Sequence, residues 1–221
     1  MLRDSFDFNI LGERYSLPRI DSDSQTKESI LMNATLLFAR KGYSSVSMRD
    51  IADTIGIKPA SLYNHFGSKE LLWKAVLAHA KDLYLLYFKH LEKSMETAQT
   101  FQEVLELVFL EPKKWANIFT CYAFCMIRAE QFRDPEAAEI NTRILIRYNN
   151  DFIQSWFDKC VERGWARPFD TRTMAAMAAN SVHMAMDVKV QECLGREPAY
   201  DPAEMMQNVQ NLIIQFVVKE G

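Results

Sequence analysis

The chain has 221 residues, of which 48% are hydrophobic and 25% charged, and its formal net charge is −3. This composition suits a globular protein with one or two hydrophobic cores and argues against an extended disordered chain. No run approaches the roughly 20 apolar residues of a membrane helix, and residues 1–25 lack the apolar stretch of a secretion signal. We therefore expect a cytoplasmic protein.

Charge is distributed unevenly along the chain. Residues 24–90 contain nine Lys and Arg against five Asp and Glu, whereas residues 91–221 contain fourteen against nineteen. Such asymmetry is expected when one domain meets phosphate groups and another does not. Chance variation also explains a difference of this size.

Residues 1–23 show no sustained hydrophobic periodicity and are predicted to form a flexible N-terminal arm. Arg3, Arg14 and Arg19 offer an alternative in which the arm contacts a DNA minor groove. Beyond the arm, apolar residues recur at helical spacing between Gly and Pro residues, which predicts an all-α fold. The expected helices span residues 26–41, 48–55, 59–65, 69–95, 101–111, 113–131, 135–163, 171–194 and 202–219, with bounds good to about 2 to 4 residues.

The segment from Ser47 to Phe66 carries the start and stop signals of two short helices. Ser47 followed by Asp50 is an acidic form of the capping box, and Gly56 suits the left-handed residue that ends a helix. Pro59 is typical of the first turn of the next helix. The sequence therefore predicts a helix-turn-helix, with Leu62 and Phe66 facing its core.

DNA is the partner expected of this motif, because its second helix enters the major groove and exposes its first residues to base edges. Pro59, Ala60, Ser61 and Asn64 are expected to read bases, whereas the neighbouring polar and basic side chains contact phosphates. The predicted DNA-binding residues are Ser47, Arg49, Lys58, Pro59, Ala60, Ser61, Tyr63, Asn64, His65 and Lys69.

Residues 26–77 resemble the DNA-binding domain of the TetR family of bacterial transcriptional regulators. The similarity lies in the lead helix ending Phe-Ala-Arg-Lys-Gly-Tyr (38–43), in Ser-Met-Arg-Asp-Ile-Ala (47–52) and in Ser-Leu-Tyr-Asn-His-Phe-Gly-Ser-Lys-Glu (61–70). One departure is Lys58, where many members of the family have a capping serine. Lysine cannot accept the amide hydrogen bond, so we expect altered specificity with binding retained.

The resemblance implies a three-helix DNA-binding domain at residues 24–70, then a helical effector-binding and dimerisation domain at residues 71–221. It also implies repression and a homodimer formed by the last two helices. In a homodimer, the DNA-binding domain of each copy is a reading head. Two reading heads about 34 to 36 Å apart fit half-sites one helical turn apart, and the two-fold symmetry of the dimer favours a palindromic operator. The apolar faces of these helices are Met174, Met177, Ala178, Val182 and Ala185, and Met205, Val209, Leu212, Ile213 and Phe216.

The middle of the chain has aromatic and methionine residues at helical spacing, interrupted by a few polar groups. Each such residue alone is more typical of core packing. A largely apolar region with a few polar groups also describes small-molecule sites, so we predict a pocket for an apolar or aromatic effector. The predicted ligand-binding residues are Trp115, Phe119, Tyr122, Met126, Phe152, Trp156, Asn180 and His183.

Three other functions are weaker readings of this sequence. Cys121 and Cys125 with His183 suggest a metal sensor, and a thiol redox sensor is also conceivable, but the four dispersed cysteines favour reduced core thiols. A helical scaffold without operator binding is a further alternative. No phosphate-binding loop, H-E-x-x-H or nucleophile elbow occurs, so we expect neither an enzyme nor a cofactor or bound metal.

Overall fold

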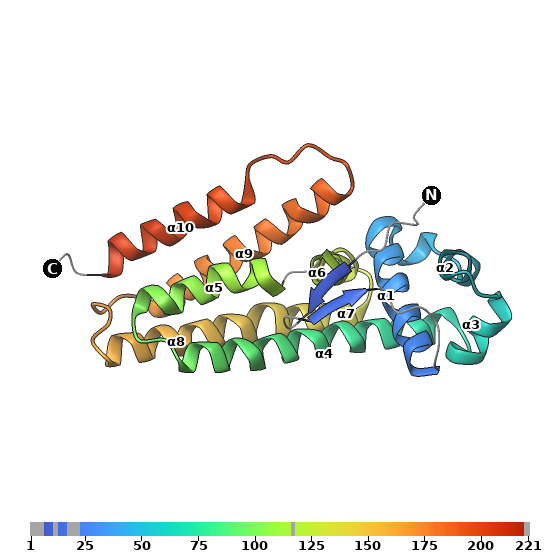
Figure 1. Ribbon diagram of the computed structural model, residues 1–221, viewed down its shortest axis with the longest axis horizontal. Helices are drawn as coiled ribbons and strands as arrows, with labels where there is room; N and C mark the ends of the chain where they lie inside the picture. Colours follow the sequence, from blue (N-terminus) through green and yellow to red (C-terminus); the bar gives the residue numbers. More distant parts are fainter. Residues whose placement is uncertain (1–6, 11–12, 17–22, 116–117, 219–221) are drawn as a thin grey trace. The chain divides into compact units, whose positions relative to one another are not determined.

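The computed structural model describes residues 7–10, 13–16, 23–115 and 118–218, and over residues 23–115 and 118–218 the predicted all-α fold is confirmed (Figure 1). Most predicted helix bounds lie within about 3 residues of the observed ones, but the helix predicted over 113–131 begins only at Ile118. A 3-10 turn, η1 (Tyr43–Ser45), and a π-helix, η2 (Asn141–Tyr148), accompany the α-helices. These are α1 (Asp23–Lys41), α2 (Met48–Ile55), α3 (Pro59–Phe66), α4 (Lys69–Glu96), α5 (Phe101–Trp115), α6 (Ile118–Glu130), α7 (Pro135–Ile140), α8 (Asn149–Glu162), α9 (Thr171–Cys193) and α10 (Pro202–Val217).

The N-terminal region contains a hairpin that the sequence analysis did not predict. Strand β1 (Asp7–Ile10) pairs antiparallel with β2 (Glu13–Ser16). The alternation of polar and apolar residues in Asp-Phe-Asn-Ile is the period-2 signal of a strand, but four residues are too few to stand out. Of the three arginines proposed for a minor groove, Arg14 lies in β2, and Arg3 and Arg19 lie outside the described residues.

Two helices differ from their predicted form. Helix α5 continues through Pro112, where the sequence predicted a break. An interior proline costs a helix about 3 kcal/mol, and the buried face of α5, which includes Val104 and Phe109, offsets this cost by packing. The helix predicted over 135–163 is interrupted by η2, because a π-helical stretch leaves no mark in an apolar pattern that continues across it.

Contacts divide the chain into two units. The first contains α1, η1, α2, α3, α4 as far as Leu83, α6 and α7. The second contains α4 from Tyr84, α5, η2, α8, α9 and α10. This grouping differs from the predicted boundary after residue 70, because it adds α6, α7 and the first part of α4 to the unit that holds the helix-turn-helix.

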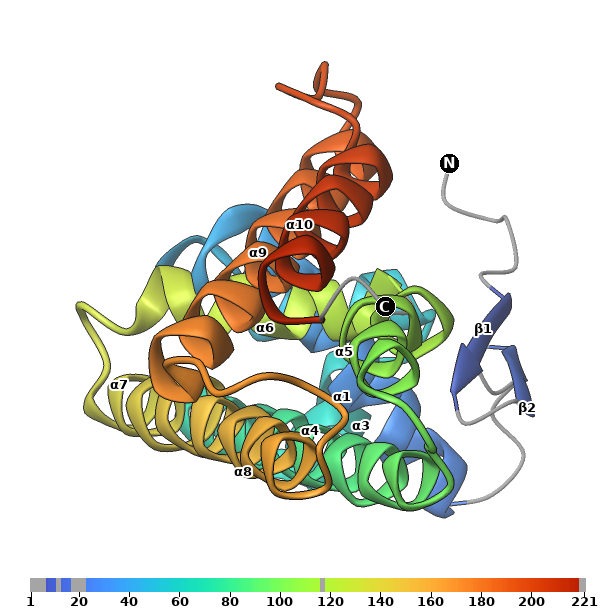
Figure 2. The ribbon, with the colours of Figure 1, turned by 90° about the vertical axis from the view of Figure 1, so that its left-hand side faces the viewer.

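The core of the second unit lies among α4, α5, α8, α9 and α10. Helix α9 packs against both α8 and α10, as Figures 1 and 2 show. Ala178, Ala185 and Ile213 are buried in this core, so part of the apolar faces assigned to a dimer is used within the unit. Among the helices of the described residues, none combines the length and apolarity that crossing a bilayer requires.

Candidate nucleic-acid interface

Helix α2 begins with the predicted capping box. The Ser47 hydroxyl oxygen accepts a hydrogen bond from the backbone N–H of Asp50 at 3.1 Å, and the backbone N–H of Ser47 donates to Asp50 Oδ2 at 2.7 Å. The Ser47 hydroxyl also donates to Asp50 Oδ2 at 2.6 Å, and this bond, followed by the one from the Ser47 backbone N–H, holds the pKa of the Asp50 carboxyl below its ordinary value. Gly56 ends the helix in the left-handed conformation, with φ 79° and ψ 29°. The turn between the two helices is thus fixed by local chemistry.

Removing the cap provides a stability test. We expect Ser47→Ala to lower the free energy of unfolding by about 1 kcal/mol, because the amide of Asp50 loses its acceptor. Urea denaturation followed by circular dichroism measures this change. Ser44→Ala, at an exposed serine of the preceding turn, is the matched control. Equal stability of the Ser47 variant and the wild type would contradict the role of the cap.

Helix α3 buries one side and exposes the other. Leu62 is fully buried and Phe66 nearly so, and α3 packs against α2, where Ile51 is also fully buried. The opposite side carries exposed residues, including Tyr63 with 49% of its surface accessible. The predicted base-reading residues Pro59, Ala60, Ser61 and Asn64 are all exposed on α3.

Lys58 occupies the N-cap position of α3 in an extended conformation, and its side chain makes no capping hydrogen bond. Its ammonium group is exposed to solvent at the start of the reading helix. This placement agrees with the expectation that lysine here cannot replace a capping serine. It leaves the charge available for a phosphate or a guanine edge.

Basic residues lie in the helices that precede and follow α3. Arg49 on α2 lies 3.9 Å from Asp53, and both side chains are mostly exposed, so this ion pair is weak and easily exchanged for a phosphate. Lys69 opens α4, whose first turn is capped by Ser68 accepting from the N–H of Leu71 at 3.2 Å. The start of a helix attracts anions through the backbone amides that its cap leaves unpaired. His65 is half-buried, with its ring 6.5 Å from that of Phe66.

An aromatic cluster behind this surface was not predicted. The rings of Phe38, Tyr43 and Trp73 pack with centroids 5.0 to 5.6 Å apart, and Lys69 Nζ lies 4.2 Å above the Tyr43 ring. Burial, followed by the negative charges of Glu70 and Asp134, raises the pKa of the Tyr43 hydroxyl. The residues come from α1, η1 and α4, which no local sequence pattern connects.

The predicted ligand-binding residues fall in both units. Phe119, Tyr122 and Met126 are buried on α6 in the first unit, with the Arg40 guanidinium 6.0 Å from the Tyr122 ring. Their burial is also what core residues show. The Trp115 side chain lies outside the described part of the structure.

The other predicted ligand residues belong to the second unit. Trp156 is buried and Phe152 half-buried on α8. His183 Nε2 lies 3.1 Å from Asn149 Nδ2, whereas Asn180 is exposed and donates to the backbone oxygen of Ala176 at 2.8 Å. The Asn180 amide is therefore engaged by its own helix.

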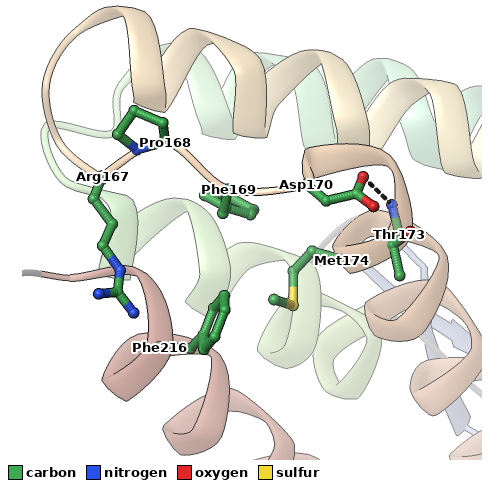
Figure 3. A pocket seen from close by; sticks show the side chains of 7 residues that line it. All are labelled: Arg167, Pro168, Phe169, Asp170, Thr173, Met174 and Phe216. Carbon is green, nitrogen blue, oxygen red and sulfur yellow. Dashed lines mark hydrogen bonds between the residues drawn. The ribbon is translucent and has the colours of Figure 1, made fainter.

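A pocket in the second unit was also missed by the sequence analysis. It has a volume of about 500 Å³ and lies between the start of α9 and the end of α10. Figure 3 shows an apolar wall of Phe169, Met174 and Phe216, with Arg167 at one side and Asp170 capping α9 by accepting from the Thr173 N–H at 3.0 Å. The other lining residue is Pro168. None of the predicted ligand-binding residues lines it.

His79 on α4 is a mostly buried titratable group of the first unit. Its ring lies 5.9 Å from that of Phe119, and Nδ1 is buried without a hydrogen-bond partner among the described residues. Burial lowers the pKa of the imidazole below 6.5, although the carboxylates of Glu28 on α1 and Asp82 on α4 partly offset this effect. The neutral form is therefore the one that the fold accommodates.

This lowered pKa predicts a pH dependence of stability. Below pH 6.5 the unfolded state binds a proton at His79, whereas the folded state binds it only at a lower pH. The free energy of unfolding therefore decreases as the pH falls through 6.5 toward the folded-state pKa. Urea titrations between pH 5 and pH 8 measure the slope. His79→Leu should reduce the slope, and an unchanged slope would contradict the assignment.

The metal and thiol alternatives receive little support. The described residues contain no group of three His, Cys, Asp or Glu side chains arranged to hold a metal ion. All four cysteines are thiols, as predicted, and burial raises the pKa of the Cys160 thiol to about 11. A thiol with so high a pKa is a poor nucleophile at neutral pH.

Comparisons with known proteins find similarity over the segment that contains α2 and α3. Residues 30–76 match the family described as "Bacterial regulatory proteins, tetR family". Over 84 residues the chain is 34% identical to the transcriptional repressor KstR2 of Mycolicibacterium smegmatis. This alignment covers 38% of this chain and 40% of that protein. The chain is 46% identical over 48 residues to the negative transcriptional regulator IcaR of Staphylococcus aureus, covering 22% of this chain and 26% of that protein. The alignments thus span less than half of either relative.

Similarity to solved structures extends over more of the chain than similarity in sequence does. A Saccharomonospora viridis protein described as a transcriptional regulator, solved in complex with choline, superimposes with a TM-score of 0.71 at 20% identity, over 90% of this chain and all of that one. The curated relatives are named as transcriptional regulators, in agreement with the prediction that the chain is not an enzyme. The segment 30–76, which contains α2 and α3, is thus similar to the TetR family of bacterial regulatory proteins.

Proposed function

We propose that this protein is a cytoplasmic DNA-binding transcriptional regulator that represses genes by occupying a palindromic operator. The observation that carries the proposal is α3, which buries Leu62 and Phe66 and exposes Ser61 and Asn64. A helix held in this way presents a fixed polar edge to a major groove. The repressor names of KstR2 and IcaR support the direction of regulation.

Operator binding is proposed to require two copies of the chain. Helices α9 and α10 leave Met177, Met184, Leu212 and Phe216 between 50% and 64% exposed. Large apolar side chains gathered on a surface indicate a protein interface. A symmetric pairing of these helices would bury them and supply the second reading head.

Salt dependence of DNA binding tests the proposal. With Arg49, Lys58 and Lys69 contacting phosphates in each of two heads, the logarithm of the association constant should fall with the logarithm of salt concentration at a slope of about −5. Fluorescence anisotropy with a selected duplex measures this slope. Lys58→Ala should make it shallower by about 2 units. Binding that is absent or insensitive to salt would favour the alternative of a helical scaffold.

We further propose that a small apolar or aromatic effector releases the protein from DNA. Support comes from the buried aromatic residues of α6 and α8 and from the apolar pocket beside Phe169. The choline complex of the S. viridis protein makes choline a useful first probe, since aromatic rings bind quaternary ammonium groups. In a thermal-shift screen of small apolar and aromatic compounds, with choline as a cationic comparison, at least one apolar or aromatic compound should raise the melting temperature. A flat screen would contradict the effector proposal and leave the DNA proposal standing.

A further inference from the structure

The pocket between the start of α9 and the end of α10 combines aromatic walls with an exposed arginine. We propose that this pocket binds a small aromatic carboxylate, with the aromatic ring between Phe169 and Phe216 and the carboxylate at Arg167. The ligand would be the effector of the proposed function, on which the inference rests. Every residue that supports it belongs to the second unit.

The segment that connects α8 to α9 is fixed on the side of α10 and on the side of the core. The backbone N–H of Arg167 donates to the carbonyl oxygen of Val217 at 3.0 Å, which ties the segment to the end of α10. The centroid of the Phe169 ring lies 5.9 Å from those of Phe101 and Phe157, and both of these rings are fully buried. The pocket is therefore formed before a ligand binds, which reduces the entropy lost on binding.

The side chains around the pocket suit an aromatic ring. Figure 3 shows Phe169, Met174 and Phe216 facing a common space, and Phe169 and Met174 pack against the core of the unit. Aromatic rings attract one another in offset and edge-to-face arrangements, and a thioether sulfur makes favourable contacts with a ring. The volume of about 500 Å³ lies within the range of small-molecule sites. Phe216 also belongs to the surface proposed to pair two copies, so the pocket adjoins that surface.

The two charged residues of the lining, Arg167 and Asp170, differ in their availability to a ligand. Asp170 accepts a hydrogen bond from the Thr173 backbone N–H at 3.0 Å, and bonds from the Thr173 side chain and then its backbone hold the pKa of the Asp170 carboxyl below its ordinary value. The Arg167 guanidinium lies 5.0 Å from the centroid of the Phe216 ring, and no acidic side chain among the described residues forms an ion pair with it. Its N–H donors are therefore available to a carboxylate, which a guanidinium can bind through two parallel hydrogen bonds.

The placement of these charges selects the sign and the direction of the ligand. Figure 3 shows Arg167 and Asp170 on opposite sides of the pocket. A carboxylate at Arg167 gains a charged hydrogen-bonded contact and leaves its ring over the apolar wall. A carboxylate in the reverse direction would be repelled by Asp170. An ammonium group would meet an aspartate already bonded to Thr173 and would be repelled by Arg167, so the pocket favours an anion.

The test uses the full chain and three naphthalene compounds of similar size: 2-naphthoate, the neutral 2-naphthamide and the cationic 2-naphthylmethylammonium. Acetate supplies a carboxylate without the ring. Arg167→Gln removes the charge from the pocket. Arg163→Gln is the matched control, because Arg163 is an exposed arginine that lies 4.7 Å from the Trp165 ring centroid and does not line the pocket. Circular dichroism establishes that each variant is folded at the assay temperature.

Isothermal titration calorimetry measures the affinities. We expect 2-naphthoate to bind the wild type with a Kd of about 10 μM to 1 mM. The amide, the cation and acetate should bind at least about tenfold more weakly, because each lacks either the charged contact or the ring. Arg167→Gln should lower the affinity for 2-naphthoate about tenfold, to the level of the amide, and leave the amide affinity unchanged. Arg163→Gln should change neither affinity.

Nuclear magnetic resonance of methyl-labelled methionine locates the ligand. The Met174 methyl signal, assigned by its loss in Met174→Leu, should shift when 2-naphthoate is added, because an aromatic ring next to the methyl group changes its chemical shift. An unshifted Met174 signal, equal affinities for 2-naphthoate and the amide, or tighter binding of the cation would overturn the assignment of this pocket. Binding of 2-naphthoate at Met174 by a protein that binds no operator DNA would instead support the site and overturn the proposed function.

Discussion

Placing glutamate at both Met177 and Leu212 should convert a dimer of this protein to a monomer and weaken binding to a palindromic duplex by at least about hundredfold. The two side chains are 53% and 64% exposed in the single chain. Their burial between two copies would contribute about 1.5 to 3 kcal/mol for each side chain. Symmetry places every substitution in the interface twice, so four carboxylates would replace apolar contacts.

Sedimentation velocity measures the association state, and anisotropy measures affinity for a palindrome and for one half-site. Gln207→Glu adds the same charge to an exposed position on α10 whose side chain points away from Leu212, and it should leave both measurements unchanged. The double variant should retain its weak half-site binding. A dimer that persists in the double variant would show that the second copy binds elsewhere.

Mutations should divide the exposed residues of α3 into those that contact phosphates and those that contact bases. Tyr63→Ala should weaken binding to a selected operator and to a random duplex by the same factor, because a phosphate contact carries no sequence information. Asn64→Ala and Ser61→Ala should weaken binding to the operator by about 10- to 100-fold and leave random duplex affinity nearly unchanged, since a base contact contributes about 1 to 3 kcal/mol of discrimination. All three residues are exposed on α3.

Competition anisotropy with matched and random duplexes distinguishes the two kinds of residue. Ala78→Ser, at an exposed position of α4, is a control that should affect neither duplex. Equal effects of all three α3 substitutions on both duplexes would contradict the division of roles. A new preferred sequence selected by the Asn64 variant would identify the base pair that Asn64 reads.

The helix-turn-helix could be predicted closely from sequence because its determinants are local. Ser47, Asp50, Gly56 and Pro59 lie within 13 residues, and the first three make hydrogen bonds with groups three or four positions away. Capping and burial on α2 and α3 followed the prediction as a result. The all-α fold was equally accessible, since helical periodicity continues through most of the chain.

The surroundings of the helix-turn-helix could not be predicted in this way. The hydrogen bonds from Tyr43 to Glu130 and from Trp73 to Asp134 join positions 87 and 61 residues apart. Nothing near Glu130 in sequence distinguishes it from an exposed acidic residue at the end of a helix. The ligand-binding residues posed the same problem, because aromatic stripes on α6 and α8 fit a core and a pocket equally well.

Selection of duplexes from a randomised pool by the full-length protein tests the central claim most directly. The account predicts enrichment of a palindrome with half-sites about 10 base pairs apart, centre to centre, together with loss of binding as salt rises. Recovery of a pool with no enriched motif at modest ionic strength would contradict it.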